Sequence, residues 1–185
     1  MRLVLIAGAL AGLALMTSWP SVYAASGDKA ASLAAFDTVA KVMTHPRCMN
    51  CHTTTAWPTQ GDKSERHGFN VVRGPDGRGQ GGMRCSNCHK DKNIANIPGA
   101  KDWHMPPLSQ GWTGLTPGAL CRTLGDPEKN GNRTGAKILE HVHADALVVW
   151  SWTPGAKRTP PPVTHKDFVA AAETWIRTGA HCPSS

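Results

Sequence analysis

A pattern of two cysteines and a histidine, Cys-x-x-Cys-His, occurs twice in this chain and constrains its fold more than any other feature. The two copies are RCMNCHT and RCSNCHK, and the second begins 37 residues after the first. With 6 Cys and 9 His among 185 residues, chance would produce about 0.01 such matches. The repeated residues are Cys48, Cys51, His52, Cys85, Cys88 and His89. Any fold for this sequence must therefore present the same small constellation at two places.

Cys-x-x-Cys-His is the attachment signature of c-type haem. Two thiols one helical turn apart can add to the two vinyl groups of a porphyrin, and the adjacent His can rise to the iron as its proximal ligand. The sequence therefore predicts two haem c groups. Their thioether anchors would be Cys48, Cys51, Cys85 and Cys88, and their proximal iron ligands would be His52 and His89.

Two other kinds of site compete with haem. The two Cys pairs could form a four-thiolate zinc site, but 33 residues separate Cys51 from Cys85, more than the usual 15 to 20 or so of that pattern. Zinc would also not require a His after each pair. A thioredoxin-like redox pair is a weaker interpretation, because no alternation of strand and helix surrounds either motif.

The N-terminal segment predicts export. A single basic residue, Arg2, precedes an apolar run over residues 3–16, and small residues follow around Ala24. This is the pattern of a secretory signal peptide over residues 1–24, since the run is shorter than the ~20 residues of a membrane-spanning helix. We expect a periplasmic protein with one domain over residues 25–185 and no membrane span after cleavage.

The chain is poor in material for a conventional core. It has 3 Phe and 1 Tyr but 19 Gly and 14 Pro, so much of the backbone must form turns and loops. A large apolar prosthetic group would supply the missing core. The net charge is +7, but the basic residues are scattered singly, which argues for steering onto protein partners and against nucleic acid.

Cys121 and Cys182 remain outside the motifs. In an oxidising compartment this even remainder predicts one structural disulfide, closing a loop of about 60 residues.

Four segments carry helix signals. Residues 30–44 have apolar residues at helical spacing and end before Pro46. Thr116, Thr134 and Thr164 are candidate N-caps of further helices, which are expected to end near Leu124, His143 and Gly179. Residues 53–83 and 91–115 are expected to be loops, and residues 146–152 could be extended. The predicted fold class is a mainly α, small c-type cytochrome domain with both haems in one core, long Gly/Pro-rich loops and one disulfide.

The sequence does not decide which residue is the distal ligand of each iron. A closed sixth position favours electron transfer, whereas an open one can bind a small molecule. His67 lies in the loop between the motifs, and His141 lies on the helix predicted after Thr134. Met105, in a Trp-His-Met-Pro-Pro segment, is similar to the distal Met-Pro loop of class I cytochromes c. Met105, His104 and His45 rank below His67 and His141 as candidates, while His143, His165 and His181 are expected at the surface.

Residues 45–183 resemble a family of exported dihaem cytochromes c associated with isoquinoline 1-oxidoreductase-type molybdenum hydroxylases. The resemblance is carried by HPRCMNCH, HGFNVVRGPDGRG, RCSNCH, PGAKDWHMPP, LCRTLGDPEKNGNRT, VVWSWTPGAKRTPPP and WIRTGAHCP. It implies positions equivalent to His45, His67 and His141, whereas the Met105 position is variable in the family.

These observations predict an electron carrier with no catalytic residues of its own. It would accept electrons from a partner dehydrogenase, such as a molybdenum hydroxylase, and pass them to a cytochrome or oxidase of the respiratory chain. The sequence has no nucleotide loop or flavin fingerprint. The alternatives are a dihaem enzyme of peroxidase or small-molecule oxidoreductase type with one open axial position, and a structural subunit whose haems do not turn over.

Overall fold

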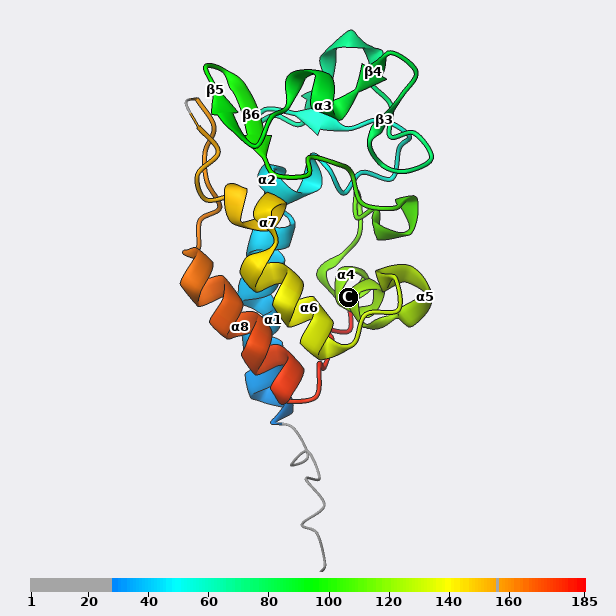
Figure 1. The fold of residues 1–185 in the computed structure, drawn as a ribbon. Helices are drawn as coiled ribbons and strands as arrows, with labels where there is room; N and C mark the ends of the chain where they lie inside the picture. Colours follow the sequence, from blue (N-terminus) through cyan, green and yellow to red (C-terminus); the bar gives the residue numbers. More distant parts are fainter. Residues whose placement is uncertain (1–27, 156) are drawn as a thin grey trace, which may run out of the picture.

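The computed structural model describes residues 28–155 and 157–185. The predicted signal peptide therefore lies outside the described residues. The longer helices lie toward one end of the molecule, and the short hairpins lie at the other end together with the short helix α3 (Figure 1). The α-helices are α1 (Lys29–Met43), α2 (Pro46–Met49), α3 (Cys85–Cys88), α4 (Pro117–Gly125), α5 (Pro127–Asn130), α6 (Gly135–Ala144), α7 (Ala146–Trp150) and α8 (His165–Arg177).

The strands form three separate antiparallel hairpins. These are β1 (Thr59–Gln60) with β2 (Glu65–Arg66), β3 (Gly79–Gln80) with β4 (Met83–Arg84), and β5 (Lys92–Ile94) with β6 (Ile97–Ala100). Two 3₁₀ turns complete the described elements, Gly68–Asn70 and Leu108–Gln110. Within the described ranges, no helix is both long enough and apolar enough to cross a bilayer.

Side-chain caps set the starts of the long helices. The Asp28 carboxylate accepts from the N–H groups of Ala30 and Ala31, and α1 ends at Met43, shortly before Pro46. Each of the three predicted Thr caps accepts a backbone N–H three residues on: Thr116 from Ala119, Thr134 from Lys137 and Thr164 from Asp167. The four helices predicted from sequence are thus confirmed.

Helices α1 and α8 pack along each other and form the core of the helical end (Figure 1). The rings of Phe36 and Trp175 lie 5.3 Å apart, and the Ser32 hydroxyl donates to the backbone oxygen of Trp175. The buried cluster comprises Phe36, Val39, Ala40, Val42, Met43, Trp112, Leu120, Cys121, Leu124, Val142, Phe168, Ala172 and Trp175. Within α1, the last residue of this buried cluster is Met43, which comes shortly before the first motif.

The predicted disulfide is confirmed: Cys121 of α4 is bonded to Cys182, with Cα atoms 5.5 Å apart. Cys121 is fully buried. The bond ties the C-terminal segment after α8 to α4, and Arg122 adds a hydrogen bond to the Pro183 carbonyl.

Two local predictions need correction. Residues 146–150 are helical rather than extended, because Asp145 accepts from the N–H groups of Leu147 and Val148 and caps α7. Residues 92–100 form the β5–β6 hairpin rather than a loop. The segment 53–83 is mostly loop as expected, although it contains the β1–β2 hairpin and most of β3–β4.

Candidate functional site

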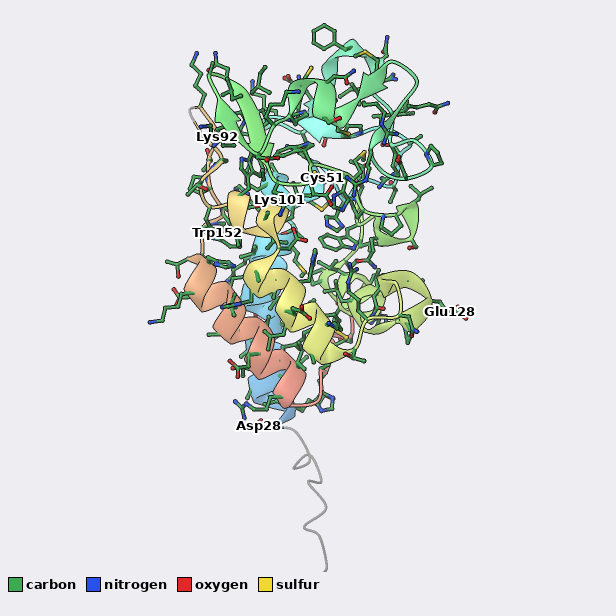
Figure 2. All side chains as sticks on the ribbon, in the orientation of Figure 1. Asp28, Cys51, Lys92, Lys101, Glu128 and Trp152 are labelled. Atoms are coloured by element: carbon green, nitrogen blue, oxygen red, sulfur yellow. A yellow bond between two sulfur atoms is a disulfide. The ribbon has the colours of Figure 1, made fainter. Side chains whose placement is uncertain are left out.

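The first motif begins in α2, the short helix that follows α1. Its Cys51 lies between the helical end and the hairpin end of the molecule (Figure 2). Cys48 is part of α2, and the N–H groups of Cys51 and His52 both donate to its backbone oxygen. This single turn presents both thiols and the imidazole together. The predicted constellation therefore forms locally, as the spacing requires.

His52 is fixed in orientation by two neighbours. Its Nδ1 atom lies 2.8 Å from the Gln110 backbone oxygen, and its ring stacks on Trp112 with centres 3.5 Å apart. Burial lowers the pKa of His52 to about 3, which keeps the imidazole neutral. A metal requires a neutral ring nitrogen, and with Nδ1 engaged it would meet Nε2.

A cavity of about 160 Å³ lies against this motif. Cys48, Cys51 and His52 line it from α2 and the following turn, and His141 of α6 lines it as well. His141 Nδ1 is 3.3 Å from an Asp145 carboxylate oxygen, and this contact is the main reason that the pKa of Asp145 falls to about 2. A carboxylate on Nδ1 holds the ring and leaves Nε2 as the metal-binding atom.

The second motif forms α3 and is placed by the hairpins on both sides of it. The His89 N–H donates to the Cys85 backbone oxygen, and His89 Nδ1 lies 2.7 Å from the Pro98 carbonyl of β6. The His89 ring stacks on Trp103, with centres 4.4 Å apart and planes nearly parallel. This His is therefore oriented by a backbone carbonyl and an aromatic face, as His52 is.

His67 lies beside His89 in the second site, with the two ring planes inclined at 63°. Their ring centres are 6.1 Å apart, and His67 Nδ1 lies 2.8 Å from the Gly68 backbone oxygen. Two imidazoles bound through Nε2 on opposite sides of one metal, with metal–nitrogen bonds of about 2 Å, would have ring centres roughly 6 Å apart. The separation of the two rings thus suits a shared metal ion.

A larger cavity of about 520 Å³ lies at the second motif. Cys85, Cys88, His67 and His89 all line it. The two cavities also adjoin, because four residues line both of them: Arg47, Cys51, Trp103 and Trp150. Trp103 and Trp150 meet edge to face, with ring centres 4.8 Å apart. Two groups bound here would be separated by one shared aromatic wall.

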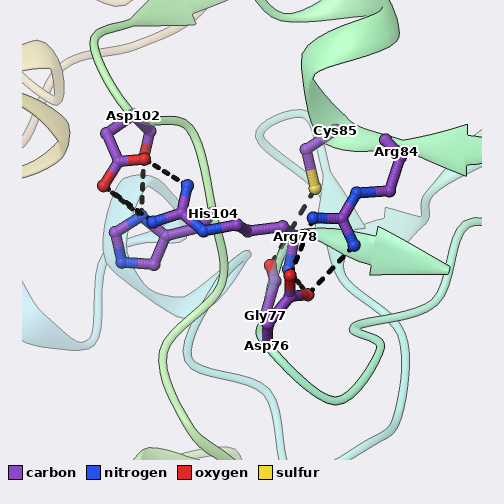
Figure 3. Close-up of polar contacts among 7 residues, drawn as sticks. All are labelled: Asp76, Gly77, Arg78, Arg84, Cys85, Asp102 and His104. Carbon is purple, nitrogen blue, oxygen red and sulfur yellow. Dashed lines mark hydrogen bonds and ion pairs between the residues drawn. The ribbon is translucent and has the colours of Figure 1, made fainter.

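Figure 3 shows polar contacts beside the second motif, including those of Asp102 and His104, the neighbours of Trp103 in the chain. Arg84, which precedes Cys85, forms two hydrogen bonds with the Asp76 carboxylate, the shorter of 2.7 Å. Arg78 likewise binds both oxygens of Asp102. Since Asp102 precedes Trp103, the Arg78–Asp102 pair ties the Trp103 segment to the residue before β3, and the Arg84–Asp76 pair joins the two ends of the β3–β4 hairpin that leads into α3.

The lower-ranked candidates lie in different places. Met105 is 5% exposed and lines the larger cavity. Its N–H donates to the Gly77 carbonyl, and its own carbonyl oxygen would be 2.3 Å from a Cβ at Gly77, which has a φ of +74°. This close approach requires glycine. His104 lines the smaller cavity, and its Nδ1 lies 2.6 Å from the Asp102 backbone oxygen.

His45 caps α2, its Nδ1 accepting from the Arg47 N–H, and it is not among the described residues that line either cavity. Of the histidines expected at the surface, His143 is exposed. His165 is half-buried, with its Nε2 2.8 Å from the Val142 carbonyl.

The positions of the four motif cysteines bear on the two competing sites, a zinc site and a redox thiol pair. Over residues 28–155 and 157–185, no three His, Cys, Asp or Glu side chains converge where they could hold a metal ion by themselves. Cys48, Cys51, Cys85 and Cys88 are free thiols. Burial raises the pKa of Cys48 to about 12 and that of Cys51 to about 11. The four sulfurs therefore do not form a zinc cage in this structure, and thiolate chemistry is disfavoured at the first pair.

The residues that line the two cavities supply the groups that a covalently attached porphyrin would need. Each motif lies in the wall of a cavity with a His that could approach from another segment, and Trp rings line both cavities. Trp112, which lines the smaller cavity, has a buried Nε1–H without a hydrogen-bond partner in the described structure. Such a donor suits a ligand that carries an acceptor.

Sequence reasoning did not single out Arg47, Trp103 or Trp112. Arg47 had a visible signal, because each motif is preceded by Arg. The two Arg residues nevertheless differ: Arg47 is 4% exposed, whereas Arg84 is half-buried and pairs with Asp76 at the surface. The positions of Trp103 and Trp112 depend on contacts with distant segments. Comparison with models of known families, with curated proteins and with solved structures gives no match to this chain.

Proposed function

We propose that this protein is an exported electron carrier with two covalently bound c-type haems. One haem would be held by Cys48, Cys51 and His52, and the other by Cys85, Cys88 and His89. In each attachment, a cysteine S–H adds across a vinyl C=C bond, so that sulfur joins one carbon and hydrogen the other, and no atom is lost. The bound iron would supply the change of valence on which electron transfer depends.

The observation that carries the proposal is the pairing of each motif with a His from another segment. His67 and His89 have ring centres 6.1 Å apart. His52 and His141 line one cavity, and their Nδ1 atoms are both engaged by oxygen acceptors. We assign His67 and His141 as distal ligands. Two protein ligands on each iron favour electron transfer over small-molecule chemistry.

The remaining residues of the site position these ligands and lie between the two cavities. Backbone oxygens of Gln110, Pro98 and Gly68 fix three of the imidazoles. Trp103 and Trp150 separate the two cavities by a thin aromatic wall, which supports short-range electron exchange between the two sites. The net charge of +7 includes Arg2 of the predicted signal peptide, and the remaining charge of +6 suits steering onto acidic redox partners. The proposed donor is a dehydrogenase, such as a molybdenum hydroxylase, and the acceptor is a cytochrome or oxidase.

Spectroscopy of the haem-loaded protein tests this function. We expect low-spin iron at both sites, no Met-to-iron charge-transfer band in the oxidised near-infrared spectrum, and no binding of carbon monoxide after reduction. A high-spin ferric signal with carbon monoxide binding would instead favour the dihaem enzyme. A Met-to-iron charge-transfer band would show that Met105, rather than a His, is the distal ligand of one haem.

A further inference from the structure

Arg47 is the one charged residue among the four that line both cavities. Its side chain is 2% exposed. One guanidinium nitrogen donates to Asp62 at 2.6 Å, but the Nε–H is buried and has no hydrogen-bond partner in the described structure. An unpaired donor on a buried cation costs free energy unless a ligand supplies the missing acceptor.

Asp62 satisfies the cation only in part. Its carboxylate also accepts from the Thr159 N–H at 3.1 Å and from the Thr159 hydroxyl at 2.7 Å, and its side chain is 40% exposed. Burial lowers the pKa of Arg47, and the Asp62 charge opposes that change. A single, shared and partly solvated carboxylate is a weak counter-charge for a buried guanidinium.

Arg73 provides an internal comparison. It is 7% exposed, and its Nε is also buried without a hydrogen-bond partner in the described residues. However, its terminal nitrogens donate to the carbonyls of Pro106, Thr53 and Thr55, and it is not among the described residues that line either cavity. Arg73 thus joins loops, whereas Arg47 presents an unused donor at the junction of the cavities.

We propose that Arg47 binds a carboxylate at this junction, donating its Nε–H to a propionate of one haem while its charge acts on both irons. This inference rests on the proposed function. A charge-assisted hydrogen bond from a guanidinium to a carboxylate is roughly twice as strong as one between neutral groups. A nearby positive charge disfavours the ferric state, so Arg47 would raise both reduction potentials.

The first test replaces Arg47 by Gln in the haem-loaded protein and measures both potentials. We expect the equilibrium constant for one-electron reduction of each haem to fall about tenfold, a shift of about 59 mV. The potentials should also become pH-dependent, because an unpaired propionate takes up a proton more readily. Arg177→Gln is the matched control, since it removes the same charge from an exposed position on α8, and it should leave both potentials unchanged.

The outcomes separate this inference from the proposed function. Wild-type protein without two haems would contradict the proposed function. R47Q with two haems and wild-type potentials would overturn the role of Arg47 and leave the electron carrier intact.

A second measurement needs no variant and so decides the question if R47Q does not fold. In proton NMR of the reduced wild-type protein, we expect a slowly exchanging Arg47 Nε–H in contact with propionate methylene protons. A rapidly exchanging proton without that contact would overturn the inference.

Discussion

Replacing His67 by Ala should open the iron held by His89 to carbon monoxide, and replacing His141 by Ala should open the iron held by His52. Each change removes an imidazole that we place on the far side of one metal, so the vacated position becomes available to a small ligand. We expect the reduced variants to bind one carbon monoxide per chain, against none for the wild type. Absorption spectra during carbon monoxide titration measure this directly.

His143→Ala is the matched control for His141→Ala. His143 lies on the same helix but is exposed, so its loss should leave both irons closed. If neither H67A nor H141A binds carbon monoxide, the distal assignment is wrong. Met105→Ala and His104→Ala then become the informative variants, because both residues line a cavity.

Removing the disulfide should lower the free energy of unfolding of the haem-loaded protein by about 4 kcal/mol. The bond joins residues 61 positions apart, and closing a loop of that length restricts the unfolded chain by roughly this amount in the chain-entropy model. The double variant C121A/C182A, unfolded by denaturant and compared with the wild type, measures the effect. Its visible spectrum should not change, because neither cysteine lines a described cavity.

The double variant also removes a buried sulfur atom, because Cys121 is fully buried. Reduction of the wild-type disulfide controls for this loss of packing, since it breaks the bond and keeps both sulfur atoms. Thioether bonds resist the reductant, so the haems should stay attached. A loss of less than about 1 kcal/mol in both experiments would contradict this prediction, because the bond would then restrict the unfolded chain far less than the chain-entropy model requires.

Local signals in the sequence were enough to predict the long helices. Thr116, Thr134 and Thr164 each accept the expected backbone N–H, and α1 ends before Pro46. The extended prediction for residues 146–152 failed because the cap, Asp145, follows directly on the end of α6. The apolar run from Ala146 carries no turn residue that separates strand from helix, and the Asp145 cap makes it helical.

The candidate site was predictable only in part, for a physical reason. The Cys-x-x-Cys-His turns are local and form as their spacing requires, whereas the approach of His67 to His89 depends on three short hairpins with little strand signal of their own. The burial of Arg47 depends in the same way on segments distant in the chain. Its counter-charge, Asp62, is held by a hydrogen bond from the Thr159 hydroxyl, 97 positions away in the chain.

Haem stoichiometry tests the central claim most directly. Pyridine haemochrome analysis and the intact mass of protein matured with its export machinery should give two covalently bound haems per chain. The two haems should remain on the polypeptide after denaturation and extraction with acidified organic solvent. One haem, none, or haem that is released by extraction would contradict the account.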